Sequence, residues 1–237
     1  NLDVSDNITD QFDGNASVLA QLHDRLDDHA HVRVQTTSCI GMNDQGPAML
    51  VNGLPVTRLD AEKIAQICAC INQQLPVEDW PEALFKVSSK IYRRDVLLQT
   101  PPLAGEALRQ LKLSDSENIL QQLAKSGLRG RGGAGFNTAD KWRYGREAPG
   151  SDRVVICNAD EGEPGTFKDR VLLSDYADTL FEGMALCAGV TGASKGLLYL
   201  RAEYRYLLPH LRRILHKRRR QNLLGNAILG DPDWHFD

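Results

Sequence analysis

The chain has 237 residues, a quarter of them charged, and a net charge of −3 at neutral pH. This length suffices for one or two domains with a sizeable hydrophobic core. No apolar stretch approaches the length of a membrane-spanning helix, and the slightly acidic balance does not favour nucleic-acid binding. We therefore expect a soluble globular protein with no secretory signal, no direct membrane insertion and no nucleic-acid partner.

The first 75 residues predict a small α/β unit. Apolar side chains recur at helical spacing in two stretches, and two short apolar runs flank a turn of the type that closes hairpins. This order of elements resembles the C-terminal half of a thioredoxin-like domain. The expected elements are a helix at 15–26, a strand at 32–36, a hairpin of 48–51 with 54–57, and a helix capped by Asp60.

The loop after the first expected strand resembles the cluster loop of 2Fe–2S thioredoxin-like subunits. That loop has two cysteines four residues apart, whereas here Cys39 is followed by Asn43 and no cysteine pair lies upstream. Four thiolates are the usual requirement for such a cluster. The departure from the pattern predicts a metal-free, degenerate thioredoxin-like domain over residues 1–75.

The cysteines as a group indicate a reducing compartment. The chain has five, none of them in a C-x-x-C pair, and this odd count is typical of a cytoplasmic protein. Cys157 and Cys187 lie in apolar runs, which predicts that both are small core residues. The histidines are scattered, so no metal ligands are expected.

Residues 76–113 carry several prolines and differ in composition from their surroundings, which predicts a connector over the surface of the next domain. After it, Ser114 and Glu117 form the pattern of a capping box, followed by apolar residues on one helical face. The sequence therefore predicts a helix directly before the most glycine-rich part of the chain.

That glycine-rich part holds five glycines between Gly127 and Gly135, together with two arginines. Such a run suits a backbone that takes positive φ or touches a ligand, and its successive N–H groups can form a concave anion site.

Residues 130–135 match G-x-G-x-x-G, but the loop follows a helix rather than a strand, which argues against an ordinary dinucleotide fold. No Gly-Lys-Ser/Thr closes the run, so it is not a P-loop. We expect a cofactor cradle; the alternative is a flexible loop.

Residues 153–157 form a short β-branched run, which predicts a buried strand that leads into a polar segment ending at Arg170. Because ligands of α/β folds gather at the carboxyl ends of strands, this segment is suited to recognising hydroxyls and ring nitrogens. A solvated acidic turn or a metal site is the alternative, although the spacing excludes an EF-hand. The candidates are Asn158, Asp160, Glu161 and Glu163.

The sequences SGLRGRGGAGFNTADKW, from residue 126, and VVICNADEGEPGTFKDR, from residue 154, together resemble the flavoprotein subunit of respiratory complex I. They look most like the diaphorase subunit of NAD-reducing hydrogenases, and NAD-dependent formate dehydrogenases have a similar subunit. In this family the two segments bind FMN and NADH. The resemblance implies FMN contacts from Gly130, Arg131, Gly132, Lys141, Asn158 and Asp160, lining of the nicotinamide and adenine side by Phe136 and Tyr144, and dinucleotide contacts from Glu161 and Glu163. Because glycine has no side chain, Gly132 and Gly133 would let the backbone lie against a flat ring or a phosphate, and Gly135 is a further cofactor-binding candidate of the same loop.

The last part of the chain predicts a helix at 176–190, a strand at 196–200 and a helix bearing Leu207, Leu211 and Leu215. Strand, helix and strand in this succession favour a parallel sheet. The basic run that follows, Lys-Arg-Arg-Arg, is expected to be a solvated helix end that complements the helix dipole rather than a nucleic-acid patch.

The family resemblance implies an NADH:acceptor oxidoreductase that passes hydride between NAD(H) and FMN and electrons on to iron–sulfur centres. Direct hydride transfer requires no acid–base residue, so no catalytic residue is assigned. In the full-length family the iron–sulfur cluster and part of the flavin pocket lie in a C-terminal region, which we expect to be missing here, leaving an inactive fragment. Its expected partners are the iron–sulfur protein and the hydrogenase or formate dehydrogenase subunits of a multi-subunit redox complex.

Three alternatives remain open. The chain resembles complex I and formate dehydrogenase flavoprotein subunits as well as the hydrogenase subunit. A Rossmann-type dehydrogenase without flavin is a second possibility, and a truncated, non-catalytic assembly module is a third. Under the preferred interpretation the fold is α/β, with a degenerate thioredoxin-like domain at 1–75, a connector at 76–113 and a truncated FMN- and NADH-binding domain at 114–237.

Overall fold

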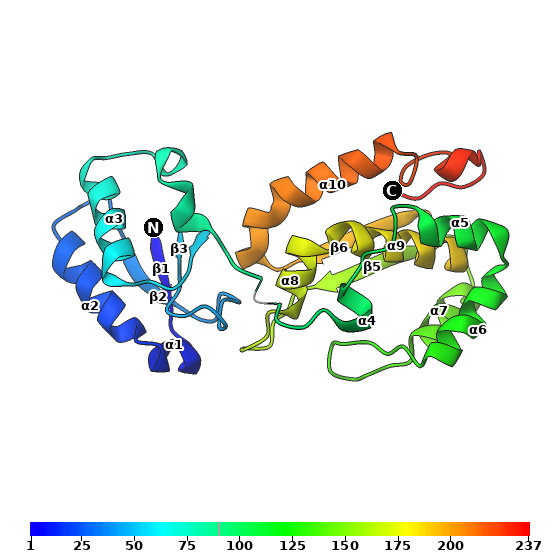
Figure 1. Cartoon of the computed structure of the whole chain (residues 1–237), viewed down its shortest axis with the longest axis horizontal. Coiled ribbons are helices and arrows are strands. Elements are labelled where there is room, and N and C mark those ends of the chain that lie inside the picture. Colours follow the sequence, from blue (N-terminus) through cyan, green and yellow to red (C-terminus); the bar gives the residue numbers. More distant parts are fainter. Residues whose placement is uncertain (90) are drawn as a thin grey trace. The chain divides into compact units, whose positions relative to one another are not determined.

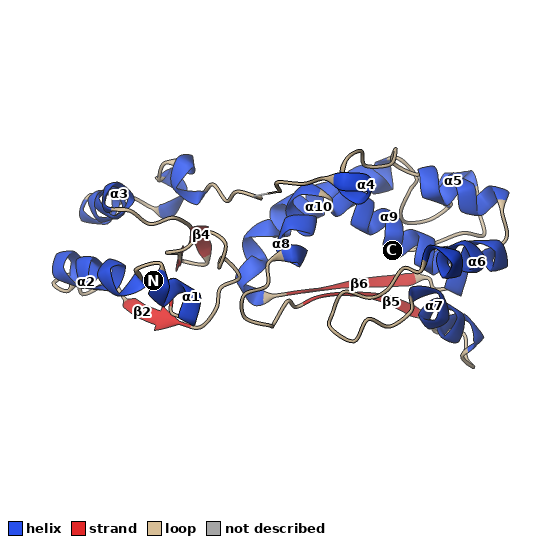
Figure 2. Ribbon diagram, turned by 60° about the horizontal axis from the view of Figure 1, so that its bottom comes forward, coloured by secondary structure: helices blue, strands red, loops and turns tan. Residues whose placement is uncertain are grey.

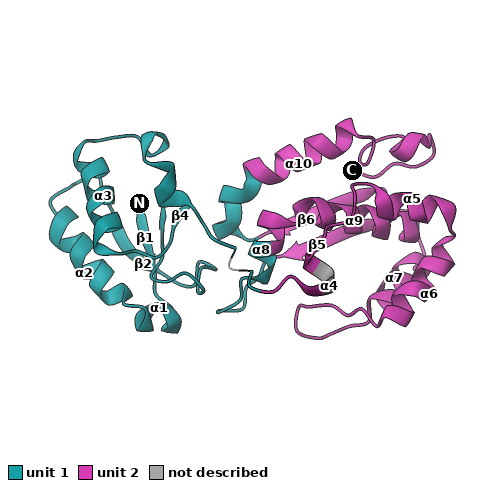
Figure 3. Ribbon diagram, viewed as in Figure 1, with its two compact units in different colours: residues 1–92, 160–171, 201–208 teal, residues 93–159, 172–200, 209–237 magenta. Residues whose placement is uncertain are grey.

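The computed structural model describes residues 1–89 and 91–237, and the chain forms two compact units that are each discontinuous in sequence (Figure 3). Residue 90, inside the expected connector, lies outside the described residues. The domain division expected from the sequence stays a prediction. Unit 1 comprises residues 1–92, 160–171 and 201–208, and unit 2 comprises residues 93–159, 172–200 and 209–237.

Unit 1 contains a mixed sheet of four strands in the order β2-β1-β3-β4. Three of them, β1, β2 and β3, are labelled in Figure 1. β1 pairs in parallel with β2 and antiparallel with β3, and β3 and β4 form a hairpin. Two helices lie between the two parallel strands and another helix follows the hairpin, which agrees with the expected thioredoxin-like α/β class. The bounds are β1 Leu2–Ser5, α1 Ile8–Phe12, α2 Asn15–Leu26, β2 Val34–Thr37, β3 Met49–Val51, β4 Leu54–Val56, α3 Ala61–Asn72, and the 3-10 helices η1 Val77–Asp79 and η2 Glu82–Phe85.

Both faces of this sheet are covered within unit 1. The apolar stripes of α2 and α3 pack against one face and form the larger core. On the other face, Leu50 packs with Ile40 and Met42 of the loop after β2, and Tyr206 packs against this second cluster. Because side chains alternate between the faces of a strand, all three residues of β3 are buried.

Most elements of unit 1 lie close to their expected positions, but β1 was not predicted although it is a central strand. Its Leu2 and Val4 alternate with Asp3 and Ser5, so a strand period is present. Two apolar residues are too few to distinguish a strand from a loop by periodicity. The expected cap of the last helix is confirmed, since the Asp60 side chain accepts a hydrogen bond from a first-turn amide.

Unit 2 contains two parallel strands, β5 and β6, and the crossover helix α9 lies along one face of them (Figure 2). The register pairs Ile156 with Leu197 and Asn158 with Tyr199. The parallel strand–helix–strand unit expected from the sequence is therefore confirmed. The remaining bounds are α4 Asp95–Leu98, α5 Glu106–Leu113, α6 Ser116–Ser126, α7 Thr138–Glu147, β5 Val154–Ala159, α8 Lys168–Asp175, α9 Ala177–Thr191, β6 Lys195–Leu200, η3 Ala202–Leu207, α10 Leu208–Arg220 and η4 Ile228–Gly230.

The second face of β5 and β6 carries large apolar side chains that stay exposed in the part of the chain that the structure describes. Val154, Ile156, Leu197 and Tyr199 are between 45% and 63% exposed. The sequence predicted two buried strands, and for this face the prediction is wrong. Parallel sheets are usually covered on both faces, which is why continuous apolar runs indicated burial. Side chains alternate along β5, which places Asn158 on the same face as Ile156, at the carboxyl end of the strand.

A buried ionic cluster joins α9, α10 and the start of α5 within unit 2. Arg218 is fully buried and donates hydrogen bonds to the carboxylates of Asp178 and Glu182. Glu182 also accepts from the backbone amides of Gly105 at 2.9 Å and Ala107 at 3.0 Å. One member of the basic run therefore supports the fold from inside, which the expectation of a solvated helix end did not include.

Two further local expectations differ from the structure. Asp115 caps α6 rather than Ser114, because its carboxylate accepts the Asn118 amide at 2.6 Å. Cys157 and Cys187 are partly rather than fully buried. The shift of the cap by one residue keeps a helix directly before the glycine loop, so the argument against an ordinary dinucleotide fold holds.

The stretch expected to be a connector also contains the amphipathic helix α5, whose Leu108 is fully buried. Within residues 1–89 and 91–237, no helix is both long and apolar enough to cross a lipid bilayer.

Candidate functional site

The glycine-rich loop of unit 2 is held at its base by three interactions. The Gly130 N–H donates to the Phe136 carbonyl at 2.9 Å and the Thr138 N–H donates to the Leu128 carbonyl at 3.0 Å, and these two bonds make an isolated antiparallel bridge between Arg129 and Asn137. The Arg129 guanidinium donates to the Gly135 carbonyl at 3.0 Å. The residues between these contacts form an exposed loop whose shape is set at its two ends.

The glycines of the loop serve two different purposes. Gly133 and Gly135 have φ of +101° and +59°, a region that favours glycine over other residues. Gly132 has no such φ, and a Cβ built on it would meet no atom of residues 1–89 or 91–237 within 4 Å. Neither backbone strain nor packing against these residues accounts for glycine there. Open space in front of this backbone, with the exposed Arg131 beside it, suits a ligand that approaches closely.

Helix α7 carries the other predicted residues of unit 2. The helix begins after Asn137, whose side chain accepts the Asp140 amide at 3.1 Å. Lys141 and Tyr144 are three residues apart, lie on one helical face and are both exposed. The Tyr144 ring centroid lies 6.4 Å from that of Phe136 in the loop. Loop and helix together therefore present a cation and two exposed aromatic rings.

Asn158 lies at the carboxyl end of β5, and its register partner in β6 is Tyr199. Both side chains are exposed. Unit 2 thus holds the predicted loop, helix and strand-end residues from Gly130 to Asn158, whereas the acidic residues that follow belong to unit 1.

The acidic residues of unit 1 divide into exposed and buried members. Asp160 and Glu163 are exposed, whereas Glu161 is only 5% exposed. One Glu161 carboxylate oxygen accepts the Asp169 amide at 2.7 Å, and the other accepts the Arg170 amide at 3.1 Å. The carboxylate therefore accepts hydrogen bonds from backbone amides in the first turn of α8, where a helix offers no acceptor of its own. The contact of Glu161 with a dinucleotide stays a prediction.

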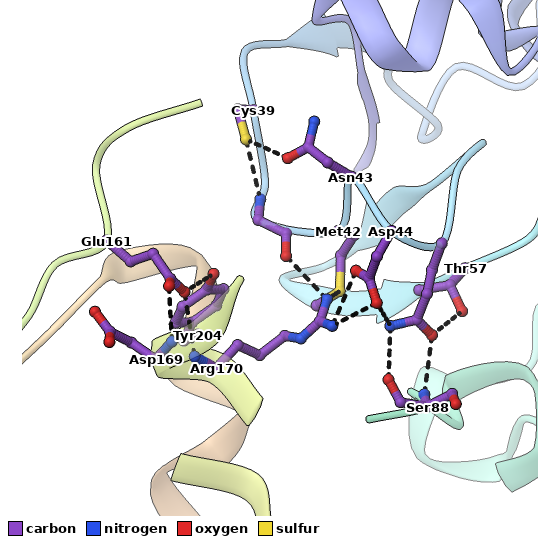
Figure 4. A network of polar contacts seen from close by, with 12 residues as sticks. Cys39, Met42, Asn43, Asp44, Thr57, Ser88, Glu161, Asp169, Arg170 and Tyr204 are labelled. Atoms are coloured by element: carbon purple, nitrogen blue, oxygen red, sulfur yellow. Dashed lines mark hydrogen bonds and ion pairs between the residues drawn. The ribbon is translucent and has the colours of Figure 1, made fainter. Parts of the chain in front are cut away.

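Arg170 links this acidic segment to the loop after β2 (Figure 4). Its side chain is 1% exposed and donates to the Gly41 carbonyl at 2.9 Å and to the Met42 sulfur at 3.0 Å. It also forms an ion pair with Asp44 at 2.9 Å. A buried charge is tolerated when it is paired and hydrogen-bonded, and this guanidinium meets both conditions.

Arg201 and Tyr204 complete the cluster from the segment after β6. Arg201 donates to the backbone carbonyl of Glu161 at 2.7 Å and to that of Cys39. The Tyr204 hydroxyl donates to the Glu161 carboxylate at 2.8 Å. Burial raises the pKa of Tyr204 above its ordinary value of 10.0, and the hydrogen bond to Glu161 raises it further. The phenol therefore stays protonated and remains a donor.

Sequence reasoning did not find the roles of Arg170, Arg201 and Tyr204. Arg170 ends the motif quoted for the family resemblance, but its partners lie more than a hundred residues earlier in the chain. Periodicity and spacing report on local neighbours only, so such a cluster leaves no pattern in the sequence.

The described residues contain no group of three or more His, Cys, Asp or Glu side chains that could hold a metal ion. The absence of a metal from the loop around Cys39 stays a prediction.

The residues of unit 2 fit a flavin mononucleotide. Gly132 leaves its backbone open to a close approach, as a planar ring or a phosphate requires. Lys141 and Arg131 are exposed cations suited to a phosphate. Phe136 and Tyr144 are exposed rings suited to stacking. Asn158 offers amide donor and acceptor atoms for ring nitrogens and hydroxyls.

Comparison with known proteins identifies relatives for most of the chain. Residues 123–231 match the family model described as the Nuo51 FMN-binding domain. The NAD-reducing hydrogenase HoxS subunit alpha of Cupriavidus necator is 42% identical over 85% of this chain. An NADH-quinone oxidoreductase subunit of Aquifex aeolicus is 41% identical over 53% of it. The chain spans 35% and 29% of the lengths of these two relatives, respectively.

Solved structures agree with these sequence matches. The crystal structure of NAD+-reducing [NiFe]-hydrogenase in the H2-reduced state matches with a TM-score of 0.84 and 43% identity, covering 91% of this chain and 39% of that chain. The air-oxidized state of such an enzyme matches with a TM-score of 0.80 and 42% identity. The chain is therefore a homologue of the alpha subunit of NAD-reducing hydrogenase and of an NADH-quinone oxidoreductase subunit, and its residues 123–231 belong to the Nuo51 FMN-binding domain family.

Proposed function

We propose that this chain is the FMN- and NADH-binding part of a diaphorase-type oxidoreductase subunit. The observation that carries the proposal is Gly132: neither a positive φ nor a contact with the described residues requires glycine there, and its exposed backbone lies in the segment that matches the FMN-binding domain. FMN held at this loop would take up hydride from NADH and release electrons singly to a further acceptor.

Each predicted residue has a role that follows from its chemistry. The backbone from Gly130 to Gly135 receives the ring or phosphate, and Arg131 and Lys141 neutralise phosphate charge. Phe136 and Tyr144 provide stacking surfaces. The amide and the exposed carboxylates at the end of β5 recognise hydroxyls and ring nitrogens; they are Asn158, Asp160 and Glu163, whereas the buried Glu161 acts by holding this segment. These acidic side chains would repel the additional phosphate of NADP, so we propose a preference for NAD.

The partners and location form a second part of the proposal. The relatives are named as subunits of a hydrogenase and of NADH-quinone oxidoreductase. We infer that this chain also works in a multi-subunit redox complex in the cytoplasm, and passes electrons to an iron–sulfur protein and a hydrogenase subunit. The likeness to the hydrogenase relative over 85% of the chain, against 53% for the NADH-quinone oxidoreductase relative, supports the hydrogenase type over the complex I type.

FMN titration of the purified chain tests the proposal. Quenching of flavin fluorescence should be saturable, and Gly132→Ala should weaken FMN binding about tenfold because the methyl group occupies the ligand's space, a loss typical of about 1.4 kcal/mol. Gly183→Ala is the matched control, because it adds the same methyl group to an open position in helix α9.

A chain that stays colourless yet binds NADH tightly would instead support a dehydrogenase without flavin. Folding without binding of either cofactor would support a non-catalytic assembly module. Either result would contradict the proposal.

A further inference from the structure

We propose that the buried arginine–carboxylate cluster of unit 1 positions the cofactor-binding acidic segment, and that the loop after β2 is its platform. The platform is residues 39–44, called here the Cys39 loop. The segment positioned is 160–171, with Arg170 and Asp44 as its main link to the platform. The consequence for FMN and NADH rests on the proposed function, whereas the positioning itself rests on the geometry of unit 1 alone.

The Cys39 loop has the internal bonding that a platform needs. The Cys39 thiol donates to the Asn43 side-chain oxygen at 2.9 Å, and the Asn43 amide group donates to the Thr9 hydroxyl at 2.7 Å. Ile40 and Met42 are buried in the core on this face of the sheet. The position where iron-binding thioredoxin-like subunits have a second cysteine thus holds a side chain that ties the loop to the start of α1.

Arg170 binds this platform through a set of hydrogen bonds that the shape of the arginine side chain makes possible. Its planar guanidinium reaches a backbone carbonyl, a thioether sulfur and the carboxylate of Asp44 at the same time. A lysine would keep the charge but has one compact donor group and cannot span these acceptors. Asp44 is itself buried, with 6% of its side chain exposed, so removing its charge would leave Arg170 without its counter-ion.

The same residue fixes the acidic segment, because the backbone amide of Arg170 donates to Glu161. Tyr204 and Arg201 bind the carboxylate and the carbonyl of Glu161 from a second direction. The Tyr204 ring lies directly against Gly41, where an added Cβ would clash with it. A shift of the Cys39 loop would therefore move Glu161, and with it the exposed carboxylates on either side.

This arrangement gives the thioredoxin-like part of the chain a function that needs no iron–sulfur cluster. Arg170, Arg201 and Tyr204 act as positioning residues, because they hold the acidic segment and are themselves buried. The competing interpretation is that the cluster only stabilises the fold. The two interpretations differ in whether a small perturbation of the cluster acts locally on the segment and on cofactor affinity.

Asp44→Asn in the full chain tests the proposal, because it removes a charge without changing the shape of the side chain. Hydrogen exchange of the Asp169 and Arg170 amides, measured without cofactor, should accelerate about tenfold, while the amides of β1 and β3 keep their exchange rates. FMN affinity should also fall about tenfold, which is within the range seen for coupled residues. Asp95→Asn is the matched control, since it breaks an ion pair of the same 2.9 Å length at the surface.

Two further variants separate positioning from loss of folding. Arg170→Lys should loosen the segment as Asp44→Asn does, because the charge alone is not sufficient. Tyr204→Phe removes only the hydroxyl and should accelerate exchange of the same two amides to a smaller extent. If Asp44→Asn unfolds the unit as a whole, the Tyr204→Phe measurement decides the question.

Unchanged exchange at Asp169 and Arg170 in these variants would overturn the positioning role. Faster exchange with unchanged FMN affinity would overturn the link to the cofactor and leave a purely structural cluster. Failure of the unmodified chain to bind FMN would contradict the proposed function, and the exchange data would still decide the positioning role.

Discussion

The glycine loop and the acidic segment were both predicted to bind cofactor, yet their construction is opposite. The loop is exposed, is bonded at its base and contains glycines that the chain's own packing does not require. The segment 160–171 is anchored by the buried side chains of Glu161 and Arg170, which bond to backbone and side-chain partners. One part leaves space for a ligand, and the other fixes a set of carboxylates in place.

This contrast predicts different consequences of mutation in the two regions. Loss of a buried side chain of the segment should lower the free energy of unfolding, because it leaves buried polar groups without partners. Loss of an exposed side chain of the loop should lower ligand affinity with little effect on folding, because exposed side chains make few contacts. Three measurements test the contrast, in order of decreasing expected effect, and a fourth with the smallest effect tests the placement of Lys141 near Cys187.

Glu161→Ala should give the largest effect, a loss of about 3 kcal/mol in the free energy of unfolding, because two amides and the Tyr204 hydroxyl lose their shared acceptor. Urea denaturation followed by circular dichroism measures it. Glu163→Ala is the control: this carboxylate is exposed on the same segment, so its removal should change stability by less than about 0.5 kcal/mol. Equal losses for the two variants would contradict the contrast.

Phe136→Ala should leave stability nearly unchanged, since the ring is 50% exposed. It should weaken NADH binding by about 1–3 kcal/mol, the usual value of stacking an aromatic side chain on a base. Titration of NADH into the FMN-loaded chain gives the affinity. Leu113→Ala serves as a control because Leu113 is an exposed apolar residue on α5. A Phe136 variant with unaltered NADH affinity would show that the ring has no stacking role.

Gly133→Ala should cost about 1 kcal/mol of stability because alanine is strained at φ of +101°. Gly132→Ala, one residue earlier, should cost less than about 0.5 kcal/mol because nothing lies within 4 Å of the new methyl group. Thermal unfolding of the two variants in parallel, without FMN, measures the difference. A larger loss for Gly132→Ala would mean that packing in the chain, and not a ligand, explains that glycine.

The smallest expected effect concerns the pKa of the Cys187 thiol in α9, which lies near Lys141 of α7. Burial raises the pKa of Cys187 from 9.0 to about 11, and the nearby charge of Lys141 partly opposes this rise. The folded state therefore favours the neutral thiol. The contribution of the neutral Cys187 thiol to the free energy of unfolding is complete below pH 9.0. It is lost as the pH rises towards 11, because the thiol ionises in the unfolded chain before it ionises in the folded chain.

Lys141→Ala should raise this pKa slightly further. Thiolate absorbance at alkaline pH, in a chain whose other cysteines are serines, measures the titration. Lys125→Ala, at the end of α6, is the control. A downward shift in the Lys141 variant would contradict the placement of Lys141 near the thiol.

The two long motifs allowed the sequence to predict the family and the candidate cofactor residues, because both motifs are local. The helices of 15–26 and 61–72 were also predictable, since burial of one face imposes a period that the sequence displays. The strands of the parallel pair were predictable as short apolar runs rather than from a period. Short elements with few apolar residues, such as β1, were not predictable in this way. The cap of α6 shifted from Ser114 to Asp115 because two adjacent capping residues compete locally.

The sequence by itself determined the family resemblance and which segments are the candidates for cofactor binding, from the glycines, the cations and the carboxylates at a strand end. Tertiary structure alone decided which of those side chains remain exposed and which become internal supports. Glu161 and Glu163 are chemically alike and two residues apart, but Glu161 is buried and Glu163 faces solvent. The difference arises because Arg170, Arg201 and Tyr204 converge on Glu161 from distant parts of the chain, and long-range convergence leaves no local pattern to read.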